Sequence, residues 1–598
     1  MITNAQYDSH TSATPGRARR RGIAVALAII LIGAAIILTA HFAYGMDVDL
    51  FRGIANDART EEDPDGLEGE TSSIIVTSPD AGDAFEVSAL GLSESSSAAQ
   101  ANTAYLQGIV DEVSEAGGGT VRIPAGSFRF AAGGAYDEGH YAIEARDNVS
   151  IVGAGEDRTA LLPSGTFADS GSFRHGVDMF WYDGTETKTF LVNADFADFT
   201  VDGKETRGSA EAYNASGKGF FFKLFRDCDW RNVVVKNTDG TGFGVDYPVN
   251  STLVGCTAIA CGKNANADSF GASGFGIGVG YSSEEGILIE GCESRDNTKY
   301  GYFFEHQTLY RDEPRARESQ GFTVRDCVAS GNLYNFGGNR AYDVSYESCV
   351  SAVSEDPKRE AYTRHAYMLE NHTVRVTFSN CVVEQECSDV DASDRCYDAV
   401  RWALGNGIAE SGPDGGKAFR PYEYATRGEA SLMLWRLSGW PGDVLIGQRV
   451  SLSSAASDVP ADSIFADAVR WLRAEGLSTN LAFRASDGIT YAEFTTMLWR
   501  LAGEPEVASA DSDEQGGDGA DEDVRAIANA GDDSPLTNVE GLPDYADAAA
   551  WAVSVGLFQP IDVNLPNAKI MRGAAVMALQ AFAELMDEGA ADAEGVSG

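Results

Sequence analysis

One short block is repeated three times in the last third of the chain. Each copy has an alanine-containing helical turn that ends in Trp402, Trp471 or Trp551, and a glycine follows five residues later. The first two copies also share the string Met-Leu-Trp-Arg-Leu, at 433–437 and 497–501. A repeat of this kind marks structural units that bury their apolar faces against one another. The sequence therefore predicts three small helical modules.

A capping signal opens the second helix of the first copy. In Thr426-Arg427-Gly428-Glu429, Thr426 is placed to cap the helix and Glu429 to complete a capping box three residues on. The repeat resembles the S-layer homology (SLH) module, in which a Thr-Arg-Ala-Glu motif begins this helix. The resemblance implies grooves between modules in which the motif arginine binds an anionic secondary cell-wall polymer.

The three copies differ at this motif. Tyr491 replaces the arginine in the second copy, and the third copy keeps Arg572 without the threonine or the glutamate. At most two of the three grooves are therefore expected to bind polymer, and a purely structural three-module unit is the alternative. The candidate polymer-binding residues are Trp402, Arg427, Glu429 and Arg572.

The region 86–385 consists of short apolar runs separated by Gly, Asn and Asp. A phrase recurs in it: a cysteine, an Asn-containing turn and a Gly-aromatic pair, with steps from 22 residues (Cys327 to Cys349) to 36 (Cys256 to Cys292). Such steps predict a parallel β-helix whose coils differ in loop length, with equal positions stacked. One internal column of unpaired cysteines is expected, from Cys256, Cys292, Cys327, Cys349 and Cys381. Cys387 and Cys396 lie outside it, and whether they pair is left open.

The start of this region carries a second resemblance. An amphipathic helix over 101–116, with Leu106, Ile109, Val110 and Val113 on one side, runs into Gly-Gly-Gly-Thr-Val at 117–121 and Pro-Ala-Gly at 124–126. This order resembles the entry to pectin-lyase-type right-handed β-helices. The resemblance implies that the helix caps the open end of the coil. The predicted fold class is mainly β, a right-handed single-stranded parallel β-helix followed by three small α-helical SLH modules.

Alternation along the strand after each Gly-aromatic pair predicts which side chains share the outer face. One external row is expected to hold Lys223, Asp246, Gly278, Glu305, Arg340 and Glu370, with Tyr247 and His306 beside it. The candidate catalytic residues are Lys223, Asp246, Tyr247, Glu305, His306 and Arg340.

Three functions are compatible with that row. A lyase or C5-epimerase needs a cation for the uronate carboxylate, here Lys223 or Arg340, and a base or acid, here His306 or Tyr247. A glycosidase needs two carboxylates, which Asp246 and Glu305 would supply. A noncatalytic binding surface is the third.

Motifs of related enzyme families are incomplete in this chain. Of the polygalacturonase motifs only the Asn-Thr-Asp at 237–239 is present, and phenylalanine stands in the Gly-His-Gly position at 274–276. The Asp-Pro-His-Glu of alginate epimerases is replaced by Asp246-Tyr247-Pro248. Either activity would therefore need a rearranged site, and the motifs do not choose between the three functions.

The N-terminal end predicts export. Four arginines within 17–21 precede an uncharged apolar run over 22–44, which is long enough to cross a bilayer. A retained signal-anchor is slightly favoured over a cleaved signal peptide, for which Ala43-Tyr44-Gly45 offers small residues. If retained, the segment makes the membrane a partner.

Composition narrows the partners further. There are 90 acidic residues against 45 Lys and Arg, a net charge of −45, which argues against nucleic acid. No metal site or cofactor is predicted, although Ca²⁺ would suit the acidity. The expected partners are an extracellular polysaccharide and the anionic wall polymer.

Together these features predict a protein on the outer face of the cell envelope, in the cell wall or surface layer. It would bind, and in the enzymatic case cleave or epimerise, a polysaccharide; a noncatalytic adhesin or surface-layer component is the alternative. The expected organisation is a basic tail at 1–21, a signal-anchor or signal peptide at 22–44, an acidic linker at 45–85, a β-helix at 86–385, SLH modules at 386–441, 456–505 and 538–586, an acidic linker at 506–537 and a tail at 587–598.

Overall fold

The computed structural model describes residues 76–77 and 85–595, apart from residues 138, 166, 169–173, 209–215, 264–272, 281–285, 307–320, 360–361, 371, 412–416, 443–455, 479–481, 507–523, 525, 528–533, 535 and 538. The predicted leader at 1–44, most of the linker at 45–85 and most of the linker at 506–537 lie outside these residues. Within the described part, no helix has the length and apolarity needed to cross a membrane.

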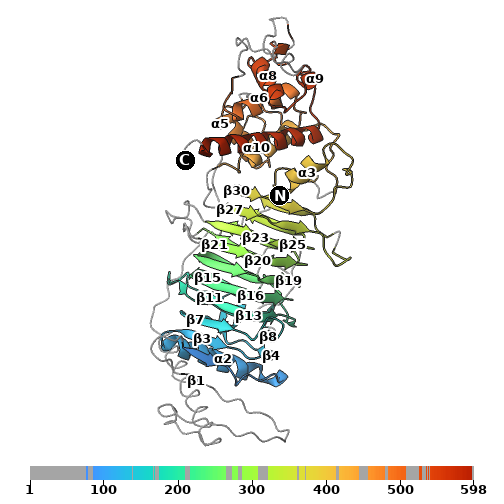
Figure 1. The fold of residues 1–598 in the computed structure, drawn as a ribbon. Helices are drawn as coiled ribbons and strands as arrows, with labels where there is room; N and C mark the ends of the chain where they lie inside the picture. Colours follow the sequence, from blue (N-terminus) through green and yellow to red (C-terminus); the bar gives the residue numbers. More distant parts are fainter. Residues whose placement is uncertain are drawn as a thin grey trace, which may run out of the picture. The chain divides into compact units, whose positions relative to one another are not determined.

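The chain from 86 to 383 winds into a parallel β-helix (Figure 1). One strand of each coil joins a ten-stranded sheet, and successive coils pair in parallel because the chain returns to the same edge after every turn. The parallel strands of this sheet are β6 (Gly139–Glu144), β11 (Val177–Asp183), β15 (Phe220–Arg226), β17 (Phe243–Val249), β20 (Ser273–Val279), β23 (Tyr300–His306), β26 (Tyr334–Asn339) and β29 (His365–Glu370).

The remaining strands of the coils form a nineteen-stranded sheet. Its members include β2 (Glu86–Ser88), β3 (Gly119–Arg122), β4 (Gly126–Phe130), β7 (Val149–Val152), β8 (Thr159–Gly165), β13 (Phe196–Asp202), β16 (Asp229–Lys236), β18 (Ser251–Val254), β19 (Thr257–Ile259), β21 (Ile287–Glu290), β22 (Glu293–Arg295), β24 (Phe322–Arg325), β25 (Val328–Ser330), β27 (Tyr342–Glu347), β28 (Val350–Ala352), β30 (Val374–Ser379) and β31 (Val382–Val383).

Side chains of one kind stack inside the coil. Aromatic rings on neighbouring strands of the ten-stranded sheet lie 4.7 to 5.5 Å apart, and Phe275 is stacked between Phe243 and Tyr302. The predicted cysteine column is confirmed, because all five thiols are buried and the Cys256 N–H donates to Cys292 Sγ at 3.3 Å. Every cysteine of the chain is unpaired, including Cys387 and Cys396.

The predicted cap at the start of the β-helix is confirmed. Helix α2 (Ala99–Glu115) buries Leu106, Ile109, Val110 and Val113. Its side chains also close the open edge by hydrogen bonding. For example, the side-chain amide Nδ2 of Asn102 donates to the Arg129 carbonyl oxygen at 3.0 Å. The helix thus covers both the apolar interior and free backbone groups of the first coil.

Three helix pairs follow the β-helix. They are α3 (Tyr397–Gly405) with α4 (Arg427–Leu437), α5 (Ala466–Ala474) with α6 (Tyr491–Leu501), and α8 (Tyr545–Ser554) and the short α9 (Pro560–Val563) with α10 (Arg572–Gly595). The predicted capping box is present: Thr426 accepts from the Glu429 N–H, and Glu429 accepts from the Thr426 N–H. Thr490 and Glu493 form the same box on α6.

A closed ring of backbone hydrogen bonds joins the three pairs. The Ala425 N–H donates to the Ile570 carbonyl, the Ile570 N–H to the Ile489 carbonyl, and the Ile489 N–H to the Ala425 carbonyl, at 2.9 to 3.1 Å. These residues precede α4, α6 and α10 at the same place in each copy. The repeat in the sequence therefore becomes a cyclic arrangement in space.

Candidate functional site

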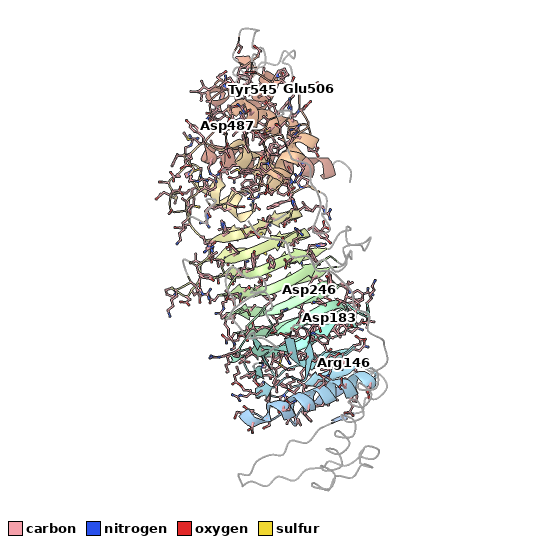
Figure 2. All side chains as sticks on the ribbon, turned by 180° about the vertical axis from the view of Figure 1, so that it is seen from behind. Arg146, Asp183, Asp246, Asp487, Glu506 and Tyr545 are labelled. Carbon is pink, nitrogen blue, oxygen red and sulfur yellow. The ribbon has the colours of Figure 1, made fainter. Side chains whose placement is uncertain are left out.

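The strand register brings charged side chains of neighbouring coils into one line. Asp183 pairs with Lys223, Lys223 with Asp246, Asp246 with Gly278, and Gly278 with Glu305. Glu305 then pairs with Asn339, and Asn339 with Glu370. Figure 2 labels Asp183 and Asp246 on this side of the coil. These seven residues are called the ionisable row below.

The row differs from the sequence prediction at one coil. Asn339 occupies the place expected for Arg340, which lies one residue further on with a φ of +53°. Arg340 follows Gly337 and Gly338, and two glycines offer no side chain from which the alternation can be counted. The row also begins one coil earlier than expected, at Asp183. That coil was missed because valine, not an aromatic residue, follows Gly176.

Two predicted neighbours of the row are buried away from it. Tyr247 has a φ of +61°, is 2% exposed and packs in a small cluster with Leu224 and Phe190. His306 is buried with its ring centre 6.2 Å from that of Tyr342, and burial lowers the pKa of its imidazole. Lys223, Asp246 and Glu305 therefore remain as the candidate residues that the structure brings together in the row.

Lys223 lies between two carboxylates. Its Nζ is 3.6 Å from Asp183 Oδ2, and it pairs in register with Asp246 on the other side. Burial raises the pKa of the Asp246 carboxyl, while the charges of Lys223 and Lys218 and a backbone hydrogen bond with Gly278 act in the opposite direction. Asp246 thus has a cationic partner, but burial outweighs it and the pKa of Asp246 lies above the ordinary value.

Glu305 has no such partner in the row. Burial, followed by the charge of Asp246, raises the pKa of Glu305 to about 7, and Lys299 and Arg340 only partly offset the rise. Glu305 lies two coils from Asp246, across Gly278, so at about 4.8 Å per coil their backbones are about 10 Å apart. Both carboxyl groups thus have raised pKa values, and only Asp246 pairs in register with a lysine of the row.

Aromatic rings accompany the row on both sides of this pair. The positions two residues earlier on the same strands hold Trp181 and Phe221, then Gly244 and Gly276, then Phe303. Trp181 stacks on Tyr141 at 4.6 Å, and Phe303 stacks on Tyr300 at 4.2 Å. Two aromatic patches are thus separated by glycines beside Asp246 and Gly278. Phe221 and Phe303 are buried, and Lys218 and Lys223 cover the Phe221 ring, so the half-buried Trp181 is the ring of this set that is open to a sugar.

Both arginines predicted to bind wall polymer are buried. Arg427 donates through Nε and an Nη to Glu493 Oε1, at 2.9 and 2.6 Å, and lies 3.5 Å from Asp487. Arg572 donates to Glu429 Oε1 at 2.5 Å and to the Phe419 carbonyl at 2.9 Å. Each pair links one helix pair to the next.

The corresponding link between the second and third helix pairs is missing on both sides. Tyr491 stands where α6 would have its arginine, and Ala574 stands where α10 would have its glutamate. The Tyr491 ring instead contacts Phe558 edge-on at 5.4 Å. Trp402, on α3, lies elsewhere: it lines an open hollow of about 570 Å³ with Phe378, Arg401 and Asn406.

Comparison with known proteins identifies the start of the helical region. Residues 388–431 match the family model of the S-layer homology domain. The chain carries an S-layer homology domain. Trp402, Arg427 and Glu429 lie in this domain, whereas Arg572 lies beyond it, on the last helix.

Other similarities concern the β-helix. The chain is 30% identical over 213 residues to the mannuronan C5-epimerase AlgE2 of Azotobacter vinelandii, which covers 34% of this chain and 18% of that protein. It is 28% identical over 211 residues to AlgE3 of the same organism, covering 34% of this chain and 10% of that one. The chain therefore spans less than a fifth of either relative.

Among solved structures, the A-module of the A. vinelandii mannuronan C-5 epimerase AlgE4 matches with 16% identity, a TM-score of 0.29 and coverage of 50% of this chain and 87% of that one. An iota-carrageenase complexed to iota-carrageenan fragments matches with 15% identity, a TM-score of 0.30 and coverage of 54% and 63%.

No group of three or more His, Cys, Asp or Glu side chains suited to hold a metal ion occurs within the described residues.

Proposed function

We propose that this chain is a cell-surface protein that hydrolyses an acidic polysaccharide along the ionisable row and is attached to the wall through its S-layer homology region. The observation that carries the proposal is the pair Asp246 and Glu305. One carboxyl group has a lysine beside it, and the other holds its proton to about pH 7. Two carboxyl groups in different protonation states are what glycoside hydrolysis requires.

The division of roles follows from the environment of each group. Glu305, whose pKa of about 7 keeps a substantial protonated fraction at neutral pH, would donate its proton to the leaving glycosidic oxygen. Asp246, in its ionised form beside Lys223, would take a proton from the attacking water. The backbones of the two residues are about 10 Å apart, close to the roughly 6.5–9.5 Å between the carboxyl groups of inverting enzymes, which leaves room for that water. Lys223 would contact a sugar carboxylate, and Trp181 would stack on a sugar ring.

Epimerisation at C5 of a uronic acid is the second candidate. Similarity to the mannuronan C5-epimerases over about a third of the chain favours it. In that reaction Lys223 would neutralise the carboxylate, Asp246 would take the proton from the adjacent carbon, and Glu305 or water would return a proton to the opposite face of that carbon. Both candidates use the same row and differ in whether a glycosidic bond breaks.

Incubation of the full chain with a panel of uronic-acid polymers tests the proposal. Hydrolysis releases reducing ends, elimination adds the ultraviolet absorbance of a double bond, and epimerisation exchanges the C5 proton for deuterium in heavy water. We expect reducing ends, lost on Glu305→Gln and retained on Glu370→Gln, its counterpart two coils further along the row. Binding without any of the three signals would instead support a noncatalytic adhesin.

The attachment proposal rests on the S-layer homology match at 388–431. We infer that the second and third helix pairs are further modules of this kind, because they close one ring with the first. Arg427 and Arg572 are already paired with Glu493 and Glu429, so a polymer carboxylate would have to displace an internal partner.

Trp402 and Arg401 line the open hollow and offer an aromatic face and a cation to the polymer without such a displacement. We expect Trp402→Ala with Arg401→Ala to reduce retention on purified wall sacculi, with unchanged circular dichroism. Trp471→Ala, the same position in the second copy, is the matched variant. Equal retention of all three proteins would contradict the assignment of this hollow to the polymer.

A further inference from the structure

A cavity lies at the end of the β-helix, where the last coil meets the first helix pair. Its volume is about 520 Å³, within the usual range of small-molecule sites. Tyr367 and Leu369 of β29 line it, whereas Glu370, the next residue, belongs to the ionisable row. Adjacent residues of a strand face opposite sides, and no residue of the row lines the cavity, so the cavity is distinct from the row. From the helical region it receives Leu404, Glu410, Arg436 and Trp440.

Two buried donors on the cavity wall lack acceptors. Trp440 is 3% exposed and Arg436 9%, yet neither the indole Nε1 nor the guanidinium Nε has a hydrogen-bond partner among the described residues. Arg436 does pair with Glu410 through a different nitrogen. An unsatisfied buried donor is unfavourable, and a ligand oxygen would relieve it. Both groups donate, so the ligand must present acceptors.

The backbone at Trp440 is also unusual. Its φ is +55°, a left-handed conformation that is rare for a bulky side chain. The repeat does not require tryptophan there, because Glu504 holds the same conformation in the second copy, with a φ of +56°. In both copies the preceding tryptophan, Trp435 or Trp499, satisfies its own indole N–H at a proline carbonyl. The extra tryptophan is absent from the second copy, and its ring lies 4.9 Å from that of Trp435 and 4.9 Å below the Arg436 guanidinium on the cavity wall.

The lining carries equal numbers of positive and negative groups. Arg364, Lys417 and Arg436 face Glu384, Glu386 and Glu410, and burial lowers the pKa of the His365 imidazole, so it is neutral at pH 7. Balanced charges do not select an ion. They offer hydroxyl groups both donors and acceptors, beside an apolar wall that includes Leu369, Val383 and Leu404.

From these features we propose that the cavity is a second binding site, which takes a neutral saccharide of one or two rings. Hydroxyl oxygens accept from Trp440 Nε1 and Arg436 Nε, hydroxyl protons donate to the glutamates, and the apolar face of the ring covers the leucines. The site would hold the neutral end or branch of a glycan, separately from the acidic chain proposed for the row.

Alkylation of Cys387 can report whether the cavity is occupied, because Cys387 lines the cavity and is the one cysteine of the nine that is not fully buried. Burial raises the pKa of its thiol to about 11, so alkylation is best followed at alkaline pH. The probes are cellobiose, maltose and di-N-acetylchitobiose, with glucuronic acid as the charged comparison. Binding is measured by calorimetry on the full chain and alkylation by peptide mass spectrometry.

We expect at least one neutral disaccharide to bind and to slow alkylation of Cys387, by about tenfold at ten times its Kd. Trp440→Glu should abolish both effects without unfolding, because Glu504 already adopts this backbone conformation. Glu305→Gln should leave both effects unchanged, which separates this site from the row. Absence of binding by all neutral probes, protection by glucuronic acid alone, or protection that survives Trp440→Glu would overturn the proposal.

Discussion

The ion pair between Arg427 and Glu493 should hold the first two helix pairs together. The Arg427 side chain is 8% exposed and that of Glu493 is 16% exposed, so both charges are largely removed from water. Loss of one partner from a buried pair costs about 3 to 5 kcal/mol, because the other charge is left uncompensated. Replacing Arg427 with Met therefore removes the ion pair and leaves the Glu493 carboxylate without its cationic partner.

The lower end of that range applies here, for two reasons. After Arg427→Met, Glu493 still accepts a hydrogen bond from the Thr490 N–H at 3.0 Å, and this bond stabilises part of the carboxylate charge. Glu493 is also not fully buried. We therefore expect the free energy of unfolding of the helical region to fall by about 3 kcal/mol. Glu493→Gln keeps the capping box, since glutamine serves at that position too. The double variant should recover at least about 1 kcal/mol of the sum of the two single losses.

Urea unfolding followed by tryptophan fluorescence suits this measurement. Six of the eight tryptophans lie in the helical region, all except Trp181 and Trp230, so the signal reports mainly on the modules. Arg484→Met is the control, because Arg484 forms an exposed pair with Asp487 at 3.6 Å, and its loss should cost less than about 0.5 kcal/mol. The role of this ion pair in holding the two helix pairs together would be refuted by either of two results. The losses of unfolding free energy could be additive in the double variant, or the loss for Arg427→Met could be no larger than that for the control.

Further predictions address the cap, the core, the thiols and the row. Thr426→Ala should lower stability by about 1 kcal/mol in the same urea assay, because it removes the cap of α4. Phe275→Ala should cost about 3 to 5 kcal/mol, measured by circular dichroism, since the ring is fully buried between two stacked neighbours. A reducing agent should leave the melting temperature unchanged, because every cysteine is unpaired; a decrease would reveal a disulfide. The pKa of Glu305 is about 7 in the folded state against an ordinary 4.5, so the folded state binds the proton more tightly and the free energy of unfolding should decrease as pH rises from about 4.5 to about 7. Glu305→Gln should remove that decrease, with a gain of at most about 3 kcal/mol above pH 7 and no gain near pH 4; a pH-independent difference would contradict the raised pKa.

Much of the β-helix could be predicted from local patterns. The cysteines mark one point of each coil and the Gly-aromatic pairs mark another, so their recurrence predicted the stacked interior. Strand alternation then predicted one row that holds Lys223, Asp246, Gly278, Glu305 and Glu370. The prediction was wrong where the pattern loses information. Gly337 and Gly338 leave the alternation undefined, so Arg340 was expected where Asn339 lies.

The candidate sites depended more on tertiary structure. Tyr247 and His306 directly follow Asp246 and Glu305 in the sequence, and they are buried away from the row because adjacent residues of a strand face opposite sides. The pKa of Glu305 depends on how much of its carboxyl is covered and on Asp246, 59 residues earlier in the chain. Neither quantity is encoded in a local pattern.

The sequence by itself determined the periodic features of this protein: the coil repeat, the buried column of thiols, the capping boxes and the number of helix pairs. Each depends on residues within one turn of a coil or helix, where backbone geometry fixes the direction of side chains. Only the tertiary structure decided that Arg572 pairs with Glu429, 143 residues away, and that a cavity forms where the last coil meets the first helix pair. Those outcomes depend on how separate units pack, because distant groups come within bonding distance only after the units have folded.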